Sequence, residues 1–291
     1  MNFRKWFYEI GEQYRNPSLQ KIYKELKKSE TYSKDQLFEI QFEKLKKIVF
    51  FALDHSLFYK DYWKDWEEEL RNNFSISLYE NLPIVSKEQL IQFNESIHTD
   101  KAFFKKRFFC ETSGTSGQVL TFLRDEYWDS FNRASILRGY SWHGVYPWEY
   151  NLYFWGYNTN FNKRLKTRFF DFLVNRYRIF DYDEKSLGKV VEKIQHASYI
   201  EGYSSMIYEL ACIAEHEKLN VKKLKMVKGT SEKIYDHYQE KVNQVFGKNM
   251  ISEYGAAESG IIAFECEKGN MHANLEGVYI ETDSENEINM L

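Results

Sequence analysis

Three short segments combine glycine with hydroxyl or acidic side chains, a combination that suits phosphate and metal binding. They are Thr112-Ser113-Gly114-Thr115-Ser116-Gly117, Gly229-Thr230-Ser231-Glu232 and Tyr254-Gly255-Ala256-Ala257-Glu258. Glycines that take positive φ let backbone N–H groups and hydroxyls converge on phosphate oxygens. The first segment therefore predicts a phosphate-binding loop, against the alternative of a plain surface loop. It is not a P-loop, because no Gly-Lys-Ser/Thr follows it.

Two side chains of the third segment have candidate roles of their own. Glu258 follows a predicted strand and a glycine, where a carboxylate can reach a magnesium ion that bridges nucleotide phosphates. The alternative is a solvated acid. Tyr254 directly follows the same strand, where its ring either stacks on a nucleotide base or packs against the protein.

Cys266 and His272 have a spacing that two zinc ligands could have. Structural zinc sites usually have four ligands, and no cysteine or histidine follows His272 in the sequence. We therefore keep two interpretations of this pair, a zinc site completed from elsewhere and two side chains with no ion.

Strand and helix patterns alternate around these segments. Strands are predicted at residues 107–110, 119–122, 197–200, 224–227 and 249–253, and helices at 186–196 and 205–215. Between the last two strands, a further helix has its apolar face at Ile234, Tyr238, Val242 and Val245. This βαβ pattern predicts the α/β class with a parallel sheet, and it places the second and third segments at one rim of that sheet.

The first hundred residues have mainly helical patterns. Ser33 with Gln36 and Ser86 with Gln89 each predict a capping box at a helix start. We therefore divide the chain into a mainly helical part, residues 1–105, and an α/β nucleotide-binding part, residues 106–291.

Composition excludes several classes of protein. The chain has 291 residues, 43% of them hydrophobic, and a net charge of −3, as expected for an ordinary folded protein. No basic stretch is long enough for a nucleic-acid footprint, and no apolar run approaches the roughly 20 residues of a membrane span. Three separated cysteines and no secretory signal indicate the cytoplasm.

The opening segment is rich in aromatic residues. Trp6, Phe7, Tyr8 and Ile10 follow Arg4 and Lys5, so a short amphipathic helix could lie on a membrane surface. The simpler interpretation, which we prefer at this point, is a terminal helix that docks its aromatic side chains on the protein's own core.

Taken together, the three segments resemble a known family. Thr-Ser-Gly-Thr-Ser-Gly-Gln at 112–118, Gly-Thr-Ser-Glu at 229–232 and Tyr-Gly-Ala-Ala-Glu at 254–258 are similar, in order and spacing, to motifs of the adenylate-forming superfamily of acyl-CoA ligases. The resemblance is strongest to phenylacetate-CoA ligases and their relatives encoded with capsular polysaccharide genes. Supporting matches lie at 82–87, 142–145 and 201–205, and the resemblance covers about residues 45 to 281.

The resemblance implies roles for individual residues. It places nucleotide phosphates at residues 112–117 with Thr112 in a catalytic role, and adenine near residues 229–232. Glu253, Tyr254 and Gly255 would contact the nucleotide, and Glu258 would be a catalytic residue that binds Mg²⁺. The same resemblance puts the acid near Tyr157, Gly202, Tyr203 and Ala256.

The implied reaction activates a small-molecule carboxylic acid with ATP and passes the acyl group to coenzyme A. Two alternatives stay open: an adenylating enzyme that transfers to an amine or a carrier protein, and a nucleotide-binding relative or scaffold of polysaccharide assembly with impaired activity. The family normally continues past the third segment to a ribose-binding aspartate and a small domain with a catalytic lysine. Since this sequence ends at Leu291, we expect a truncated form with little turnover, whose tail at 281–288 enters a hairpin without pairing.

Overall fold

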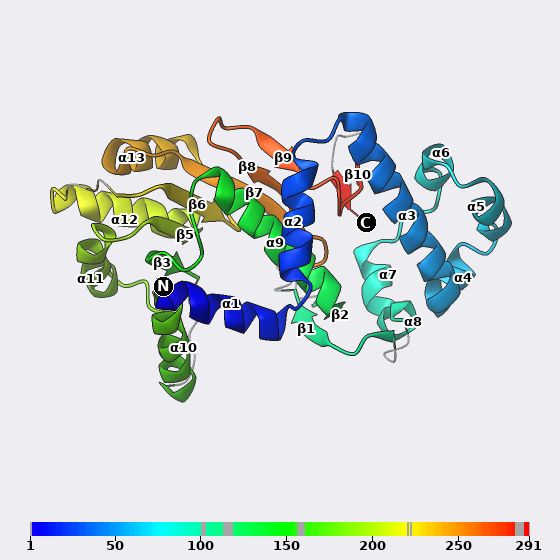
Figure 1. Ribbon diagram of the computed structural model, residues 1–291, viewed down its shortest axis with the longest axis horizontal. Helices are drawn as coiled ribbons and strands as arrows, with labels where there is room; N and C mark the ends of the chain where they lie inside the picture. The colour runs from blue at the N-terminus through cyan, green and yellow to red at the C-terminus, as the bar shows by residue number, and fades with distance from the viewer. Residues whose placement is uncertain are drawn as a thin grey trace. The chain divides into compact units, whose positions relative to one another are not determined.

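The computed structural model describes residues 2–99, 103–112, 119–155, 161–219, 221, 223–282 and 288–290. The helices are α1 (Phe3–Arg15), α2 (Leu19–Ser29), α3 (Lys34–His55), α4 (Leu57–Tyr62), α5 (Glu67–Asn73), α6 (Ile76–Glu80), α7 (Lys87–Gln92), α8 (Asn94–Ile97), α9 (Glu126–Trp142), α10 (Phe161–Leu173), α11 (Glu184–Ile194), α12 (Ser204–His216) and α13 (Asp236–Phe246) (Figure 1). The strands are β1 (Arg107–Glu111), β2 (Thr121–Asp125), β3 (Asn151–Phe154), β4 (Arg176–Arg178), β5 (Tyr199–Tyr203), β6 (Met226–Thr230), β7 (Met250–Ala256), β8 (Gly260–Glu265), β9 (Met271–Ala273), β10 (Ile280–Thr282) and β11 (Ile288–Met290).

The chain forms two compact units, and each is built from separate stretches of sequence. Unit 1 comprises Met1–Arg15, Ser135–Tyr254 and Ala263–His272. Unit 2 comprises Asn16–Ala134, Gly255–Ile262 and Ala273–Leu291. Each unit therefore combines residues from both sides of position 105.

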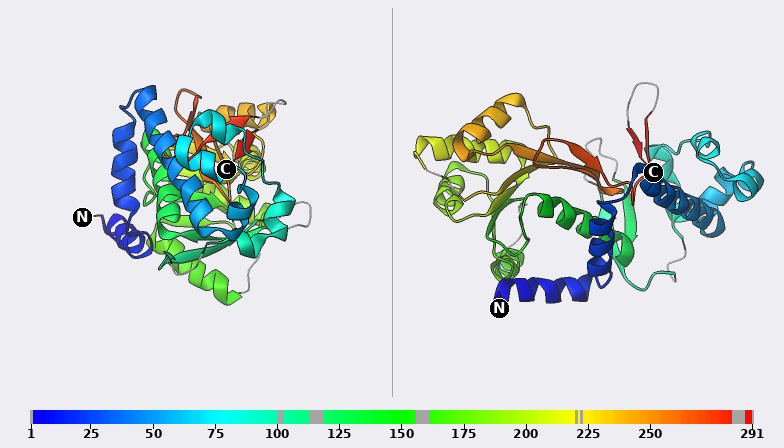
Figure 2. Two further views of the ribbon diagram at one scale, coloured as in Figure 1. Left: turned by 90° about the vertical axis from the view of Figure 1, so that its right-hand side faces the viewer. Right: turned by 45° about the horizontal axis from the view of Figure 1, so that its top comes forward.

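Unit 1 is organised by a parallel sheet, as the sequence predicts. Strand order in the seven-stranded sheet is β4-β3-β5-β6-β7-β8-β9, and the pairs β3–β4, β3–β5, β5–β6 and β6–β7 are parallel. Helices α11, α12 and α13 lie together beside β5 and β6 in Figures 1 and 2. The α/β class is thus confirmed.

The two faces of this sheet differ in chemistry. Successive side chains of a strand point to opposite faces. On one face Ile200, Val227 and Met250 join a buried apolar cluster with residues of α11, α12 and α13. On the other face, Tyr140 of α9 lies over Tyr199 with ring centroids 5.4 Å apart.

Unit 2 contains α2 to α8, the first part of α9 and two antiparallel hairpins. Its largest core packs Leu45, Val49 and Leu53 of α3 against Trp63 and Tyr79. The side chains of α3 also reach residues far along the chain, since Gln41 Nε2 donates to the carbonyl of Val278 at 2.6 Å and Lys44 Nζ to that of Glu276 at 2.6 Å. The helices and the C-terminal stretch of this unit are therefore joined directly.

Most predicted elements are confirmed, with shifted ends. Both capping boxes form, at the starts of α3 and α7. Strand β6 runs on through Gly229 and Thr230, and β7 through Tyr254 to Ala256, so part of the second and third segments lies inside the sheet. The predicted strands ended too early, at 227 and 253, because the segments that contain Gly229 and Gly255 read as loops. In the structure Gly229 still pairs within the sheet, in the register Gly202↔Gly229.

The expected unpaired tail is a wrong prediction. Strands β10 and β11 pair antiparallel, with Ile280 opposite Met290 and Thr282 opposite Ile288. The tail therefore pairs with itself. Residues 280–282 and 288–290 are close enough in sequence to form an antiparallel pair.

Replacing Gly202 with alanine should destabilise unit 1. Gly202 has φ +147, and a Cβ there would lie 2.4 Å from the backbone oxygen of Phe154. We expect Gly202→Ala to lower the free energy of unfolding by about 1–3 kcal/mol, because the neighbouring strand must shift. The measurement is urea unfolding followed by circular dichroism.

The matched control is Gly188→Ala in α11, where a Cβ would meet nothing within 4 Å. Alanine is the better helix former, so this change should leave stability equal or raise it by up to about 1 kcal/mol. Equal stability of the two variants would contradict the close approach at Gly202.

Candidate functional site

The carboxyl ends of β5, β6 and β7 bring several predicted site residues together in unit 1. The parallel register places Gly202 beside Gly229, Gly229 beside Ser252, and Tyr203 beside Thr230. Ligands of open parallel sheets gather at this rim. Residues 202–203, 229–232 and 253–254 therefore share one edge of the sheet.

Glycine is required on this rim by close packing. A Cβ on Gly229 would lie 2.5 Å from the Ser204 hydroxyl and 2.6 Å from the sulfur of Met250. Ser231 follows with φ +63, an uncommon conformation for a residue other than glycine. The backbone thus turns tightly after β6, and the hydroxyl side chain of Ser231 is exposed.

Glu232 has a partner within unit 1. Its Oε2 accepts a hydrogen bond of 2.9 Å from the backbone N–H of Ser205, in the first turn of α12. A carboxylate at this position satisfies a helix N–H that lacks an intrahelical partner and favours the positive end of the helix dipole. Glu232 therefore fixes the turn after β6 to the start of α12.

Tyr203 lies in an aromatic cluster. Its ring stacks on Trp155 with centroids 5.3 Å apart, and the ring of Tyr182 lies 6.4 Å away. Tyr254, near the carboxyl end of β7, is 41% exposed. The rim thus presents both a packed aromatic cluster and an accessible tyrosine.

A buried ion network crosses the sheet just below this rim. Lys228 Nζ lies 2.8 Å from Oε2 of Glu253 and 3.2 Å from Oε2 of Glu201. Arg176 Nη2 lies 3.4 Å from Glu201 Oε1, and the hydroxyl of Tyr140 donates to Glu201. Four strands, β4 to β7, are therefore tied by charges on the face opposite the apolar core.

The network favours the charged forms of Lys228 and Glu201. Burial alone would lower the pKa of Lys228, but Glu253 and Glu201 outweigh burial and raise it. Burial would likewise raise the pKa of Glu201, but Lys228 and Arg176 hold it below its ordinary value of 4.5. Glu253, which the sequence assigns to nucleotide contact, is thus engaged with Lys228.

The sequence patterns do not predict the pairing of Lys228 with Glu201 or a contribution from Arg176, and Glu201 belongs only to the motif match at 201–205. A signal was present, since Lys228 interrupts the apolar run 226–227 and Glu201 follows Tyr199 and Ile200. Charged residues inside a strand usually point to solvent, so one strand alone does not reveal that two opposite charges face each other.

Thr112 and Glu258 belong to unit 2. Thr112 extends the β1–β2 ladder, because its N–H donates to the carbonyl of Leu120 at 2.9 Å and its Oγ1 accepts from the N–H of Leu120 at 3.1 Å. Nearby, Arg124 Nη2 donates to the carbonyl of Ala257 at 2.6 Å and lies 2.9 Å from the sulfur of Cys110. The hairpin that carries Thr112 is thus joined to the turn that carries Glu258.

Electrostatics also place Glu258 close to this hairpin. Burial raises the pKa of the Cys110 thiol, Arg124 opposes that rise, and the carboxylate of Glu258 adds to it. The thiol, the guanidinium and the carboxylate are therefore within electrostatic reach of one another.

Two cavities of unit 2 share Glu258 in their walls. One, of 250 Å³, is also lined by Arg107, Arg124, Asp125 and Trp128, with His98. The Nε of Arg124 is buried and has no hydrogen-bond partner among the described residues. Two guanidinium groups and an unsatisfied N–H next to a carboxylate suit an anion bound together with a cation.

The larger cavity has a different lining. It measures 410 Å³, and besides Glu258 its walls include Lys44, Tyr79, Glu276 and Tyr279. Most of its remaining lining is apolar, with residues of α3. Glu258 thus lines both a cavity with charged walls of both signs and a mainly apolar one.

The other predicted site residues are divided as follows. Gly255 and Ala256 end β7 and are counted in unit 2, where a Cβ on Gly255 would lie 2.4 Å from the carbonyl oxygen of Gly260. Ser113, Gly114, Thr115, Ser116, Gly117 and Tyr157 lie outside the described residues. Unit 1 thus groups the rim residues, and unit 2 groups Thr112 with Glu258.

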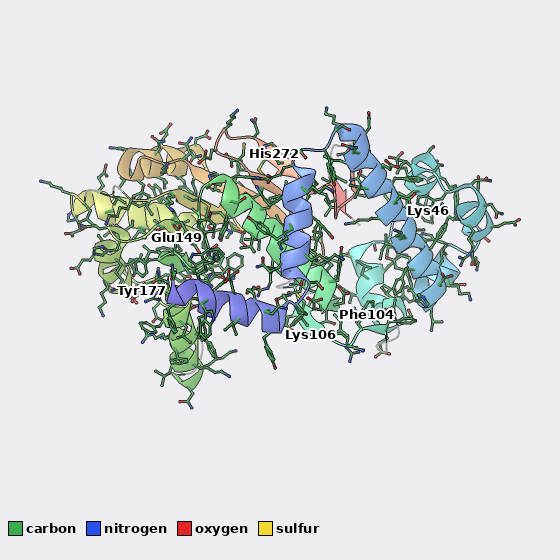
Figure 3. The ribbon with its side chains drawn as sticks, viewed as in Figure 1. Lys46, Phe104, Lys106, Glu149, Tyr177 and His272 are labelled. Carbon is green, nitrogen blue, oxygen red and sulfur yellow. The ribbon has the colours of Figure 1, made fainter. Side chains whose placement is uncertain are left out.

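Cys266 and His272 lie at either side of a tight turn between β8 and β9. The N–H of Cys266 donates to the carbonyl of Asn270 at 3.0 Å, and the ring of His272, labelled in Figure 3, lies 5.3 Å from that of Trp142. Within the part of the chain that the structure describes, no group of three or more His, Cys, Asp or Glu could hold a metal. The zinc hypothesis therefore has no third ligand among these residues.

No helix in the described ranges has both the length and the apolar character that crossing a bilayer requires.

Comparison with solved structures identifies the fold. The chain is similar to 2-hydroxyisobutyryl-CoA ligase in an open conformation with 2-HIB-AMP and CoA, with a TM-score of 0.65 and 15% identity, over 84% of this chain and 56% of that one. It is also similar to the same enzyme with these ligands in the thioesterification state, with a TM-score of 0.63 and 17% identity, over 88% and 57%. Neither protein-family models nor curated protein sequences match the chain.

These neighbours establish the class of fold. The chain has the mixed α/β fold of the N-terminal domain of acyl-CoA ligases, and it spans a little over half the length of the ligase. At this level of identity the similarity concerns the fold, and the activity is argued separately below.

Removing the central cation of the network should strongly destabilise unit 1. Lys228→Met removes the cation that pairs with both Glu201 and Glu253, and we expect a loss of about 3–5 kcal/mol in the free energy of unfolding. Lys225→Met is the matched control, because Lys225 pairs with Glu149 at 2.9 Å near the surface and is 45% exposed.

The control should lose no more than about 1 kcal/mol. Urea unfolding of both variants measures the difference. Similar losses would show that the buried network stabilises unit 1 no more than the surface pair of Lys225 with Glu149, which is labelled in Figure 3.

Acid should weaken the fold through Glu201. Its pKa is lower in the folded state, so its contribution is fully present above the unfolded value of 4.5 and is lost as the pH falls through the folded pKa. Unfolding free energies measured from about pH 7 to about pH 3 should fall less steeply with acid in Glu201→Gln than in the wild type. If the unfolding free energies of the two proteins fall equally steeply with acid, Glu201 does not contribute in this way.

Proposed function

We propose that this protein activates a carboxylic acid with ATP, forming an acyl-adenylate, and transfers the acyl group to coenzyme A. The main support is the position of residues 229–232 and 253–254 at the carboxyl ends of adjacent parallel strands, in a fold whose solved relative binds 2-HIB-AMP and CoA. The motif order found in the sequence points to the same reaction.

The nucleotide roles are part of this proposal. Residues 112–117 bind the β- and γ-phosphates, residues 229–232 frame the adenine, and the accessible ring of Tyr254 stacks on it. The cavity with Arg107, Arg124 and Glu258 supports anion binding on the unit that carries Thr112. Glu258 would hold Mg²⁺, which neutralises charge on the phosphates when bound.

The chemistry needs positioning more than a protein nucleophile. A carboxylate oxygen of the acid attacks the α-phosphorus of ATP, a new O–P bond forms, and pyrophosphate leaves. The sulfur of coenzyme A then attacks the acyl carbon, its proton goes to solvent, and AMP leaves. In the first step the protein fixes both substrates and balances the developing phosphate charge.

The acid is proposed to be of the phenylacetate type. The support is the aromatic cluster of Tyr203 with Trp155 and Tyr182 beside Gly202, since aromatic walls suit an aryl group. The sequence resemblance also assigns Tyr157 and Ala256 to binding of the acid. The sequence resemblance to capsule-associated relatives supports a setting in polysaccharide biosynthesis.

The test is binding of ATP with and without Mg²⁺, measured by calorimetry on wild type and on Glu258→Gln. We expect the variant to lose about tenfold or more of the Mg²⁺-dependent affinity, because it lacks a charged oxygen ligand. Glu267→Gln, an exposed acid in the β8–β9 turn, is the control and should bind as the wild type does.

Pyrophosphate release with a panel of aryl and aliphatic acids then tests turnover. Release that requires an acid, followed by thioester formation with coenzyme A, supports the proposal. If ATP binds and pyrophosphate release requires an acid, but the acyl group passes only to an amine or a carrier protein, then coenzyme A is not the acceptor. Equal ATP affinity in wild type and Glu258→Gln would remove Glu258 from the site.

A further inference from the structure

Helix α1 presents its apolar side to solvent. Phe3, Trp6, Ile10 and Tyr14 recur at three- and four-residue spacing and so lie on one helical face, with exposed fractions between 45% and 86%. The expectation that the aromatic side chains of this segment dock on the protein's own core is therefore met only in part: Trp6 and Ile10 are exposed, while Phe7 and Tyr8 are half-buried.

The opposite side of α1 faces the protein instead. The ring of Tyr8 lies 5.8 Å from that of Trp148, the ammonium of Lys5 lies 5.4 Å from the same ring, and Glu12 is buried. A surface helix normally buries its apolar stripe and exposes its polar one. Here the orientation is reversed, and the apolar stripe is left outward.

Helix α10 carries a second exposed stripe in the same unit. Leu165, Phe169 and Phe172 have the i, i+4, i+7 spacing of one face, and their exposed fractions lie between 61% and 65%. The two helices are joined, since Arg4 Nη1 donates to the carbonyl of Phe172 at 2.5 Å and its guanidinium lies 5.1 Å from the Phe172 ring. We call these two adjoining stripes the α1–α10 face; its members are Phe3, Trp6, Ile10, Leu165, Phe169 and Phe172.

Basic residues border the α1–α10 face. Helix α10 contains four basic residues and one acidic one, although the whole chain has a net charge of −3. The single acid, Asp171, is buried and its Oδ2 accepts a 2.8 Å hydrogen bond from Arg178. Arg164 is paired with Asp181 at 2.7 Å, but Lys166 and Arg168 are exposed and adjoin the apolar stripe at i, i+3 and i, i+4 spacing. The stripe of α10 is therefore bordered by positive charge.

We propose that the α1–α10 face docks on an anionic membrane surface. Exposed aromatic and aliphatic side chains enter the boundary between headgroups and acyl chains, while lysine and arginine side chains pair with lipid phosphates and carboxylates. A second copy of the chain fits less well, because a symmetric pairing of this face would set its basic borders against each other.

This docking is independent of the proposed acid activation. It needs no residue of the sheet rim or of the Glu258 cavities, so failure of either idea leaves the other intact.

The experiment uses the full chain and vesicles of phosphatidylcholine, with or without about 30% phosphatidylserine. Co-sedimentation should be strong with phosphatidylserine, weak without it, and reduced as salt shortens the range of electrostatic attraction. Trp6→Glu/Phe169→Glu should reduce partitioning by about tenfold or more, because both side chains lose their apolar contact with lipid. Phe38→Glu, on an exposed position of α3, is the matched control and should bind as the wild type does.

A milder variant guards against unfolding of the double variant. Lys166→Gln should lower partitioning to phosphatidylserine vesicles by about fivefold and leave the melting temperature unchanged. Brominated lipids should quench the tryptophan fluorescence of the wild type more than that of Trp6→Phe.

Three results would overturn the proposal. They are absence of vesicle binding at low salt, equal binding to vesicles with and without phosphatidylserine, and an effect of Phe38→Glu as large as that of the double variant. A dimer in sedimentation that the double variant abolishes, without vesicle binding, would assign the face to a second copy instead.

Discussion

Lys228 is the one cation on which the order of the parallel sheet most depends. It lies between carboxylates of both neighbouring strands, Glu201 of β5 and Glu253 of β7, in a site that is almost fully buried. A buried charge is tolerated only when its partners stay in place, because an unpaired charge in this environment is very unfavourable. The spacing of three strands is therefore fixed just below the rim that carries the candidate nucleotide residues.

The other face of the sheet is mainly apolar. Ile200, Val227 and Met250 pack with three helices on that side and contribute to the hydrophobic stabilisation of unit 1. Glu253 lies directly before Tyr254, so the ion pair that holds β7 also fixes the backbone from which the accessible tyrosine projects. Stability and the geometry of the rim thus rest on the same contacts.

The sequence predicted the fold well where local patterns decide it. The βαβ unit around α13 and the capping boxes at Ser33 and Ser86 follow from spacing alone, and all of them form. The burial of Lys228 could not be predicted in this way, because it depends on a partner 27 residues earlier that only strand pairing brings near. The exposure of Trp6 and Ile10 on α1 was not predicted for a related reason: periodicity shows that a helix has two faces but does not show which one meets the protein.

The interleaving of the two units has a consequence for synthesis. Residues 16–134 leave the ribosome early, yet Gln41 and Lys44 bond to the carbonyls of Val278 and Glu276, which are made more than 200 residues later. At about 5–20 residues per second, that delay lasts on the order of ten seconds or more. Helices α2 to α8 must therefore persist as a partly completed unit during translation, and their exposed apolar surface is the part of the nascent chain that chaperones would be expected to shield.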